Sequence, residues 1–196
     1  MSDFWLYLNI GLRHVLDIHA YDHVLFLTVL VVPYLFKDWK NILLLVTIFT
    51  IGHTTALVLS VYGVLTVNTA VVEFLIPITI LVTALYNLFV SARKSVKTAN
   101  INFIAFTTLF FGIIHGLGFS NYFNILIDKN ANSKLLPLLE FALGIEGAQL
   151  IVVLVVLVLS FVMQRFAGLQ KREWILVASA FVAGVAVPMI INSTIW

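Results

Sequence analysis

The sequence has 196 residues, of which 62% are hydrophobic and only 10% are charged, and its mean hydropathy is +1.09. A soluble domain carries about 25% charged residues, so this composition excludes a soluble fold and predicts one integral membrane domain over residues 1–196. The formal net charge of +2 argues against nucleic acid as a partner, and the absence of cysteine excludes disulfides, thiolate zinc sites and iron–sulfur clusters.

Apolar runs in the chain predict membrane-spanning helices, because the hydrocarbon core is about 30 Å thick and a helix rises about 1.5 Å per residue. In chain order the predicted spans are 20–36, 40–63, 69–91, 101–127, 135–165 and 173–195. An apolar, partly amphipathic stretch over residues 4–18 either extends the first span or lies at the membrane interface. The predicted fold class is therefore an all-α membrane protein with about six transmembrane helices in one bundle.

The distribution of basic residues predicts the orientation of this bundle. Turns on one side carry eight of them, against three on the other side (Arg13, Lys129 and Lys134). The eight are Lys37, Lys40, Arg93, Lys94, Lys97, Arg165, Lys171 and Arg172. By the positive-inside rule both termini face outward, toward the periplasm if the membrane is the bacterial inner membrane. The N-terminal residues lack the basic region and cleavage site of a signal peptide, so none is expected.

All five histidines lie within or beside apolar segments, and none lies in a basic turn. An ionisable side chain at the centre of the bilayer costs about 3 kcal/mol or more, so such residues indicate function by default. Counting residues along each span places the histidines and several carboxylates in the outer half of the membrane or near its midplane. One shared, cation-binding polar centre explains this common depth better than a set of unrelated buried groups.

The densest group of these residues is the run H14-V-L-D-I-H-A-Y-D-H23. His19 and His23 share one face if the run is helical. Asp22 either binds a metal directly or holds a histidine ring in the required tautomer. Asp17 and His19 are candidates for a supporting or pathway role. The alternative is a surface turn with exposed histidines at the membrane boundary.

Two further histidines stand beside glycines in later spans. His53 lies in F-T-I-G-H-T-T-A-L, and His115 lies in F-F-G-I-I-H-G-L-G-F. Glycine is a poor helix former, so Gly112, Gly116 and Gly118 predict a break in the fourth span, of the kind that lines a cavity in transporters. The alternatives are a lone histidine bridging two helices and an ordinary glycine-packed helix crossing.

Four other polar residues accompany the histidines. Glu146 is a candidate metal ligand, with Gln149 one turn further on the same helix face, and the alternative is a neutral glutamic acid hydrogen-bonded between helices. Glu73 and Asn87 are placed on one face of the third span as supporting or pathway residues, and for Asn87 simple interhelical hydrogen bonding is the preferred explanation.

Taken together, these motifs resemble the HupE/UreJ family of small membrane proteins, in its shorter second branch. The resemblance covers about residues 11–150 and rests on the blocks G11-L-R-H14, D22-H23-V-L-F-L, F49-T-I-G-H53-T-T-A-L, V72-E73-F-L-I-P77 with N87, F111-G-I-I-H115-G-L-G-F119 and L143-G-I-E146-G-A-Q149-L. It implies a nickel or cobalt permease, associated in relatives with the maturation of hydrogenase and urease. Residues on the family's motif positions are His14, Asp22, His23, His53, Glu73, His115, Glu146 and Gln149.

The residues therefore predict a divalent metal ion (nickel, cobalt or zinc) as the bound ligand, held by imidazole and carboxylate groups. The predicted ligands are His14, Asp22, His23, His53, His115 and Glu146. Two other functions stay open, namely a zinc-dependent intramembrane hydrolase with a lipid-like substrate and a metal-binding accessory protein. Beyond the metal and the bilayer, the sequence identifies no partner, and homo-oligomerisation is left open.

Overall fold

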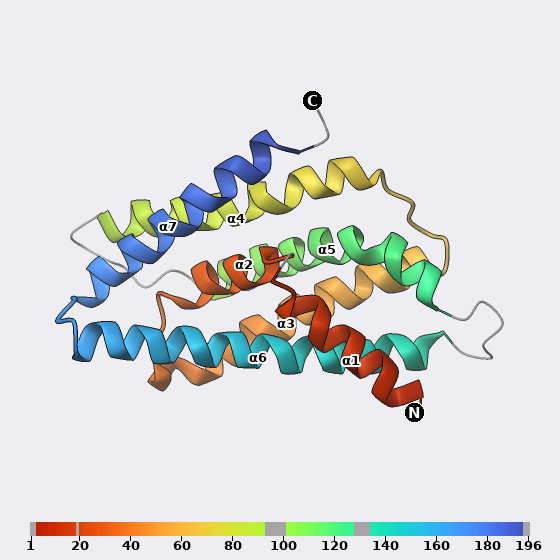
Figure 1. Cartoon of the computed structure of the whole chain (residues 1–196), viewed down its shortest axis with the longest axis horizontal. Helices are drawn as coiled ribbons and strands as arrows, with labels where there is room; N and C mark the ends of the chain where they lie inside the picture. Colours follow the sequence, from red (N-terminus) through yellow and green to blue (C-terminus); the bar gives the residue numbers. More distant parts are fainter. Residues whose placement is uncertain (1–2, 19, 93–100, 128–133, 194–196) are drawn as a thin grey trace.

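The computed structural model describes residues 3–18, 20–92, 101–127 and 134–193, and these form a bundle of helices without strands (Figure 1). Predicted spans and observed helices agree within a few residues from residue 39 onward. The helices are α1 (Asp3–Leu16), α2 (Asp22–Val31), the short 3-10 helix η1 (Phe36–Asp38), α3 (Trp39–Val61), α4 (Thr69–Ala92), α5 (Ile101–Leu126), α6 (Leu135–Arg165) and α7 (Lys171–Ile191).

The all-α membrane fold is confirmed, but the number of long spans differs from the predicted six. Within the described residues, five helices (α3 to α7) are long and apolar enough to cross a membrane. The predicted first span, 20–36, contains only the 10-residue helix α2, which is about 15 Å long at the helical rise. That length covers about half of the hydrocarbon core.

The helix α1 precedes α2 and packs against α6. Figure 1 shows α1 beginning at the end of the bundle where α6 begins, and α2 continuing toward the end where α3 begins. Between them the chain makes a turn in which the amide of Ala20 donates to the carbonyl of Asp17 at 3.2 Å. Most of the stretch 4–18 therefore forms the separate helix α1, and α1 and α2 together form a broken helix.

The predicted break at Gly112, Gly116 and Gly118 is wrong, because α5 is continuous through all three. Two of these glycines instead allow α5 to lie directly against α3. A Cβ atom added at Gly112 would strike the backbone of Phe49, and one added at Gly116 would strike the carbonyl oxygen of His53. The low helix propensity of glycine is offset here by close packing, as in small-residue crossings of membrane helices.

A second close crossing holds the broken helix in place. Gly11 of α1 and Gly144 of α6 face each other so closely that a Cβ on either would strike the backbone of the opposite helix. At the other end of the broken helix, the side-chain amide of Asn87 donates to the carbonyl of Val29 in α2 at 2.6 Å. This bond satisfies a carbonyl that the end of a short helix leaves free.

Large apolar side chains cover the outside of the bundle. Phe89 and Phe106 are 69% and 70% exposed, and both lie on long apolar helices. Such exposure suits a surface in contact with lipid rather than water. The chain is therefore a multi-pass membrane protein, and four of the polar residues buried inside it are His23, His53, His115 and Gln149.

Candidate metal site

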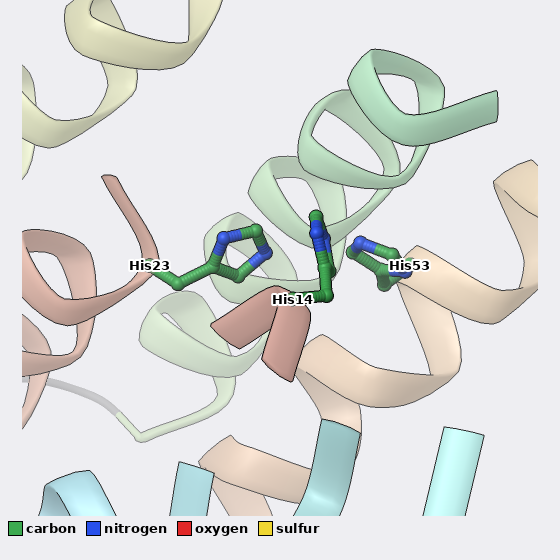
Figure 2. A group of neighbouring side chains, drawn as sticks. All are labelled: His14, His23 and His53. Atoms are coloured by element: carbon green, nitrogen blue, oxygen red, sulfur yellow. The ribbon is translucent and has the colours of Figure 1, made fainter. Parts of the chain in front are cut away.

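Three histidines from three helices meet at the centre of the bundle. His14 of α1, His23 of α2 and His53 of α3 each offer a ring nitrogen, and these nitrogens all lie within 4.8 Å of one another. Figure 2 shows the ring of His14 between the other two. The ring centroids of His14 and His23 are 4.6 Å apart, and those of His14 and His53 are 5.5 Å apart. This arrangement is consistent with the prediction from the sequence that the histidines share one polar centre.

The broken helix explains how two of the three histidines reach the same point. His14 lies in the last turn of α1 and His23 in the first turn of α2, so the turn between the helices folds both rings toward α3. A continuous helix would separate residues nine apart by about 14 Å along its axis. The third histidine, His53, lies in the middle of α3 beside the close crossing with α5.

The ring nitrogens of these histidines are buried without hydrogen-bond partners. His23 is 2% exposed and His53 is fully buried. Within the described part of the chain, Nε2 of His14, Nε2 of His23 and both ring nitrogens of His53 accept or donate no hydrogen bond. Leaving a buried polar group unpaired costs about 1–3 kcal/mol, so several together call for a ligand to satisfy them. A metal ion would accept lone pairs from all three rings.

Asp22 orients the ring of His23. Its Oδ1 accepts a hydrogen bond from Nδ1 of His23 at 3.1 Å and another from the backbone amide of His23 at 2.9 Å. With the proton on Nδ1, the lone pair of His23 is on Nε2, which is the unpartnered nitrogen. A carboxylate that orients a histidine in this way is the usual support for a metal-binding imidazole.

His115 of α5 extends the cluster on one side. Its ring centroid is 5.3 Å from that of His23, and its Nδ1 donates to the carbonyl of Phe111 at 2.8 Å. Nε2 of His115 is buried and unpartnered, as in His23. The ring lies outside the set of three within 4.8 Å, so it offers a neighbouring position rather than a further ligand in the same place.

Phenylalanine rings surround the histidines. Phe119 lies 3.9 Å from the ring centroid of His14, and Phe49 lies 5.2 Å from that of His115. Phe26 stacks on Phe49 at 5.0 Å and lies 5.4 Å from His115. This apolar lining was not predicted from the sequence, although a signal was present: Phe49 precedes His53 by one helical turn, and Phe119 follows His115 by one turn.

The other predicted ligand, Glu146, does not join the histidines. It is partly exposed on α6, and its Oε1 accepts a hydrogen bond from Oγ1 of Thr47 at 2.6 Å. Gln149 is fully buried nearby, where its Oε1 accepts from Oγ1 of Thr50 at 3.0 Å. The two residues form polar links between α3 and α6, which matches the interhelical alternative for Glu146.

The predicted supporting residues lie in different places. Asn87 contacts the carbonyl of Val29, as described above, and Asp17 is exposed in the turn after α1. Glu73 is exposed near the start of α4, where it lines a cavity that also reaches Asp22. His19 lies outside the described residues.

The arrangement is thus a buried, imidazole-rich pocket with one carboxylate beside it. Neutral imidazole binds nickel, cobalt, copper and zinc ions well, whereas magnesium and calcium prefer shells of oxygen atoms. Because the site lies deep among apolar helices, a cation must lose most of its hydration shell to enter.

Comparison with known proteins agrees with this description. A family model described as HupE / UreJ protein matches residues 1–193, essentially the whole chain. The chain therefore belongs to the HupE/UreJ family, which is associated with nickel or cobalt transport or metal insertion. No curated protein and no solved structure matches the chain significantly.

Proposed function

We propose that this member of the HupE/UreJ family is a permease for a divalent transition-metal cation, with nickel or cobalt as the transported ion. The ion is bound by His14, His23 and His53 during transport. The observation that carries the proposal is the convergence of three buried imidazoles, each with an unpartnered ring nitrogen, at a break in a membrane helix. Helix breaks at mid-membrane are where secondary transporters bind their substrates.

The hydrogen bonds that orient the histidine rings favour a site that binds and releases its ion. Asp22 and the carbonyl of Phe111 fix the tautomers of His23 and His115, so that Nε2 of each ring is available. His115 then serves as the next position that an ion reaches after leaving the three-histidine site. Adjacent sites of moderate affinity are the condition for conduction rather than storage.

Stacked aromatic rings close the site on the side of His115. Phe26 contacts His115, Phe49 and Phe111, the last at 5.9 Å between ring centroids. Passage of an ion requires these rings to move, which is the gating expected of alternating access. Uptake is favoured by an inside-negative membrane potential, which contributes about 4.6 kcal/mol for two charges across 100 mV.

The basic turns support an orientation with the termini outward and the site open to the periplasmic side of a bacterial inner membrane. The residues Lys37, Lys171 and Arg172 lie at one end of the bundle, around η1 and the start of α7. There the guanidinium of Arg172 donates to the carbonyl of Ser91 at 2.7 Å, which stabilises the end of α4.

The experiment that tests this function is nickel uptake into liposomes with an imposed inside-negative potential. His53→Ala should remove most of the uptake and of the nickel bound to the purified protein. Thr55→Ala is the matched control, because Thr55 is exposed on the same helix and bonds only its own backbone, at the carbonyl of Ile51. Equal uptake by wild type and His53→Ala would refute the proposal.

Catalytic zinc is bound by three protein ligands and by a water molecule in the fourth position. The same three histidines could supply the three protein ligands. A zinc-dependent hydrolase acting on a lipid-like substrate is therefore the second candidate, and a non-catalytic accessory protein is the third. Stoichiometric zinc that survives treatment with a chelator, together with absent uptake, would favour the hydrolase. Exchangeable nickel or cobalt favours the permease.

A further inference from the structure

A cavity of about 330 Å³ lies between α2, α4 and α7, apart from the histidine cluster. Its lining combines apolar residues of α4 and α7 with carboxylate, amide and hydroxyl groups. The residues that line it are Ala20, Tyr21, Asp22, Glu73, Ile76, Pro77, Met189, Asn192 and Ser193. No lysine, arginine or histidine is among these described residues, so two carboxylates, Asp22 and Glu73, carry all of the charge.

We propose that this cavity is the outer vestibule through which a hydrated divalent cation reaches the histidines, with Glu73 and Asp22 attracting it and Asn192 and Ser193 contacting its water shell. This inference rests on the proposed function and adds the route of entry. Its size accommodates an ion with several waters, since one water occupies about 30 Å³ in the liquid.

Asp22 connects the vestibule to the metal site. Its side chain lines the cavity, and its Oδ1 bonds Nδ1 of His23, whose other ring nitrogen faces the three-histidine site. Only the side chain of His23 therefore separates a cation beside Asp22 from the other two histidines of the site. The position of Asp22 at the start of α2 is a consequence of the helix break, so one feature forms both the site and its entrance.

The position of the cavity in the bundle agrees with an outer entrance. Glu73 is in the second turn of α4, and Asn192 and Ser193 directly follow the end of α7. These two helices pack against each other (Figure 1), and Glu73, Ile76 and Pro77 in the first half of α4 line the same cavity as Met189 near the end of α7. At the opposite ends of both helices, Arg172 near the start of α7 bonds the carbonyl of Ser91 near the end of α4, and Arg172 belongs to a basic turn that predicts the inner side.

The absence of cysteine from the sequence allows a direct test with single-cysteine variants. Ser193→Cys and Asn192→Cys place a thiol in the vestibule, and Val64→Cys places one in the exposed connection between α3 and α4 as the control. Each variant is treated from outside with two membrane-impermeant thiosulfonate reagents, one bearing a trimethylammonium group and one bearing a sulfonate. The measured quantity is the ratio of the two labelling rates at low salt.

We expect this ratio to be about tenfold higher for Ser193→Cys than for Val64→Cys, because two carboxylates attract the cation and repel the anion. Adding Glu73→Gln should lower the ratio about fourfold, and high salt should abolish the difference. Saturating nickel should slow the labelling of Ser193→Cys and leave that of Val64→Cys unchanged.

Equal ratios for vestibule and control variants would overturn the inference, and so would a failure of both vestibule variants to react from outside. Asn192→Cys keeps the test decisive if Ser193→Cys fails to fold. Nickel bound by the purified variants is measured in parallel. Loss of charge selectivity with retained nickel binding refutes the vestibule alone, whereas absence of nickel binding in the wild type refutes the proposed function.

Discussion

Replacing Gly116 by alanine should force α3 and α5 apart and move His53 away from the other two histidines. A Cβ at this position would lie 2.9 Å from Cβ of Ala56 and even closer to the carbonyl oxygen of His53. Carbon atoms prefer separations of about 3.5–4.0 Å, so the helices must separate by about 0.5–1 Å. Neither neighbour can rotate away, because one is a backbone atom and the other is a methyl group.

The size of the effect can be separated from helix propensity by a matched control. Gly184 is also in a long helix, α7, and an added Cβ there meets nothing within 4 Å. Both replacements gain the same propensity, up to about 1 kcal/mol, whereas overpacking costs Gly116→Ala about 1–3 kcal/mol. The stability difference between the two variants should therefore be about 1–3 kcal/mol, with Gly184→Ala the more stable.

Nickel affinity should fall together with stability in Gly116→Ala. A metal–imidazole bond is about 2.0–2.1 Å long, so a displacement of about 0.5–1 Å at His53 weakens one of three ligands. We expect a loss of about tenfold in affinity, measured by calorimetry in detergent, beside unfolding followed by tryptophan fluorescence. If Gly116→Ala matches Gly184→Ala in both measurements, the crossing of α3 and α5 does not position His53.

Three other predictions concern the metal site. Asp22→Asn should lower nickel affinity about 10–100-fold, because a neutral amide fixes the Nε2 lone pair of His23 less well; a change of less than twofold would contradict this role. Affinity should fall as the pH is lowered, since only neutral imidazole binds a metal; calorimetry in buffers of different ionisation enthalpy should detect any released protons, and an affinity that stays flat from about pH 8 down to about pH 4 would exclude histidine ligands. Competition experiments should show that cobalt and zinc displace nickel, whereas millimolar magnesium does not; displacement by magnesium would indicate a site made of oxygen atoms.

Some parts of the site were predictable from the sequence because they depend on what the membrane excludes. Buried histidines are costly in lipid, so their occurrence in apolar runs indicated a common polar centre. The pair Asp22–His23 was also predictable, since adjacent residues at a helix start remain neighbours in any packing. The role of Phe49 was available too, one helical turn before His53, but apolar residues are so common in this chain that the pattern carried little weight.

Other parts depended on contacts between distant segments. The glycines of α5 predicted a break by propensity alone, but their fit against Phe49 and His53 stabilises a continuous helix. Glu146 was expected among the histidines, and the rotation of α6 in the bundle turns it toward Thr47 instead. A helix face is fixed by all of its neighbours together, and sequence spacing reports only one helix at a time.

By itself, the sequence determined that this protein is embedded in lipid, where its long helices begin and end, and which kinds of metal ligand it offers. Hydropathy and residue chemistry are properties of single segments, so they can be read without the fold. The tertiary structure decided where the helix breaks, which three histidines meet and which two carboxylates line the cavity beside them. The reason is physical: the turn between α1 and α2 is held by the Gly11–Gly144 crossing and by the bond from Asn87 to Val29. Both contacts join residues far apart in the chain.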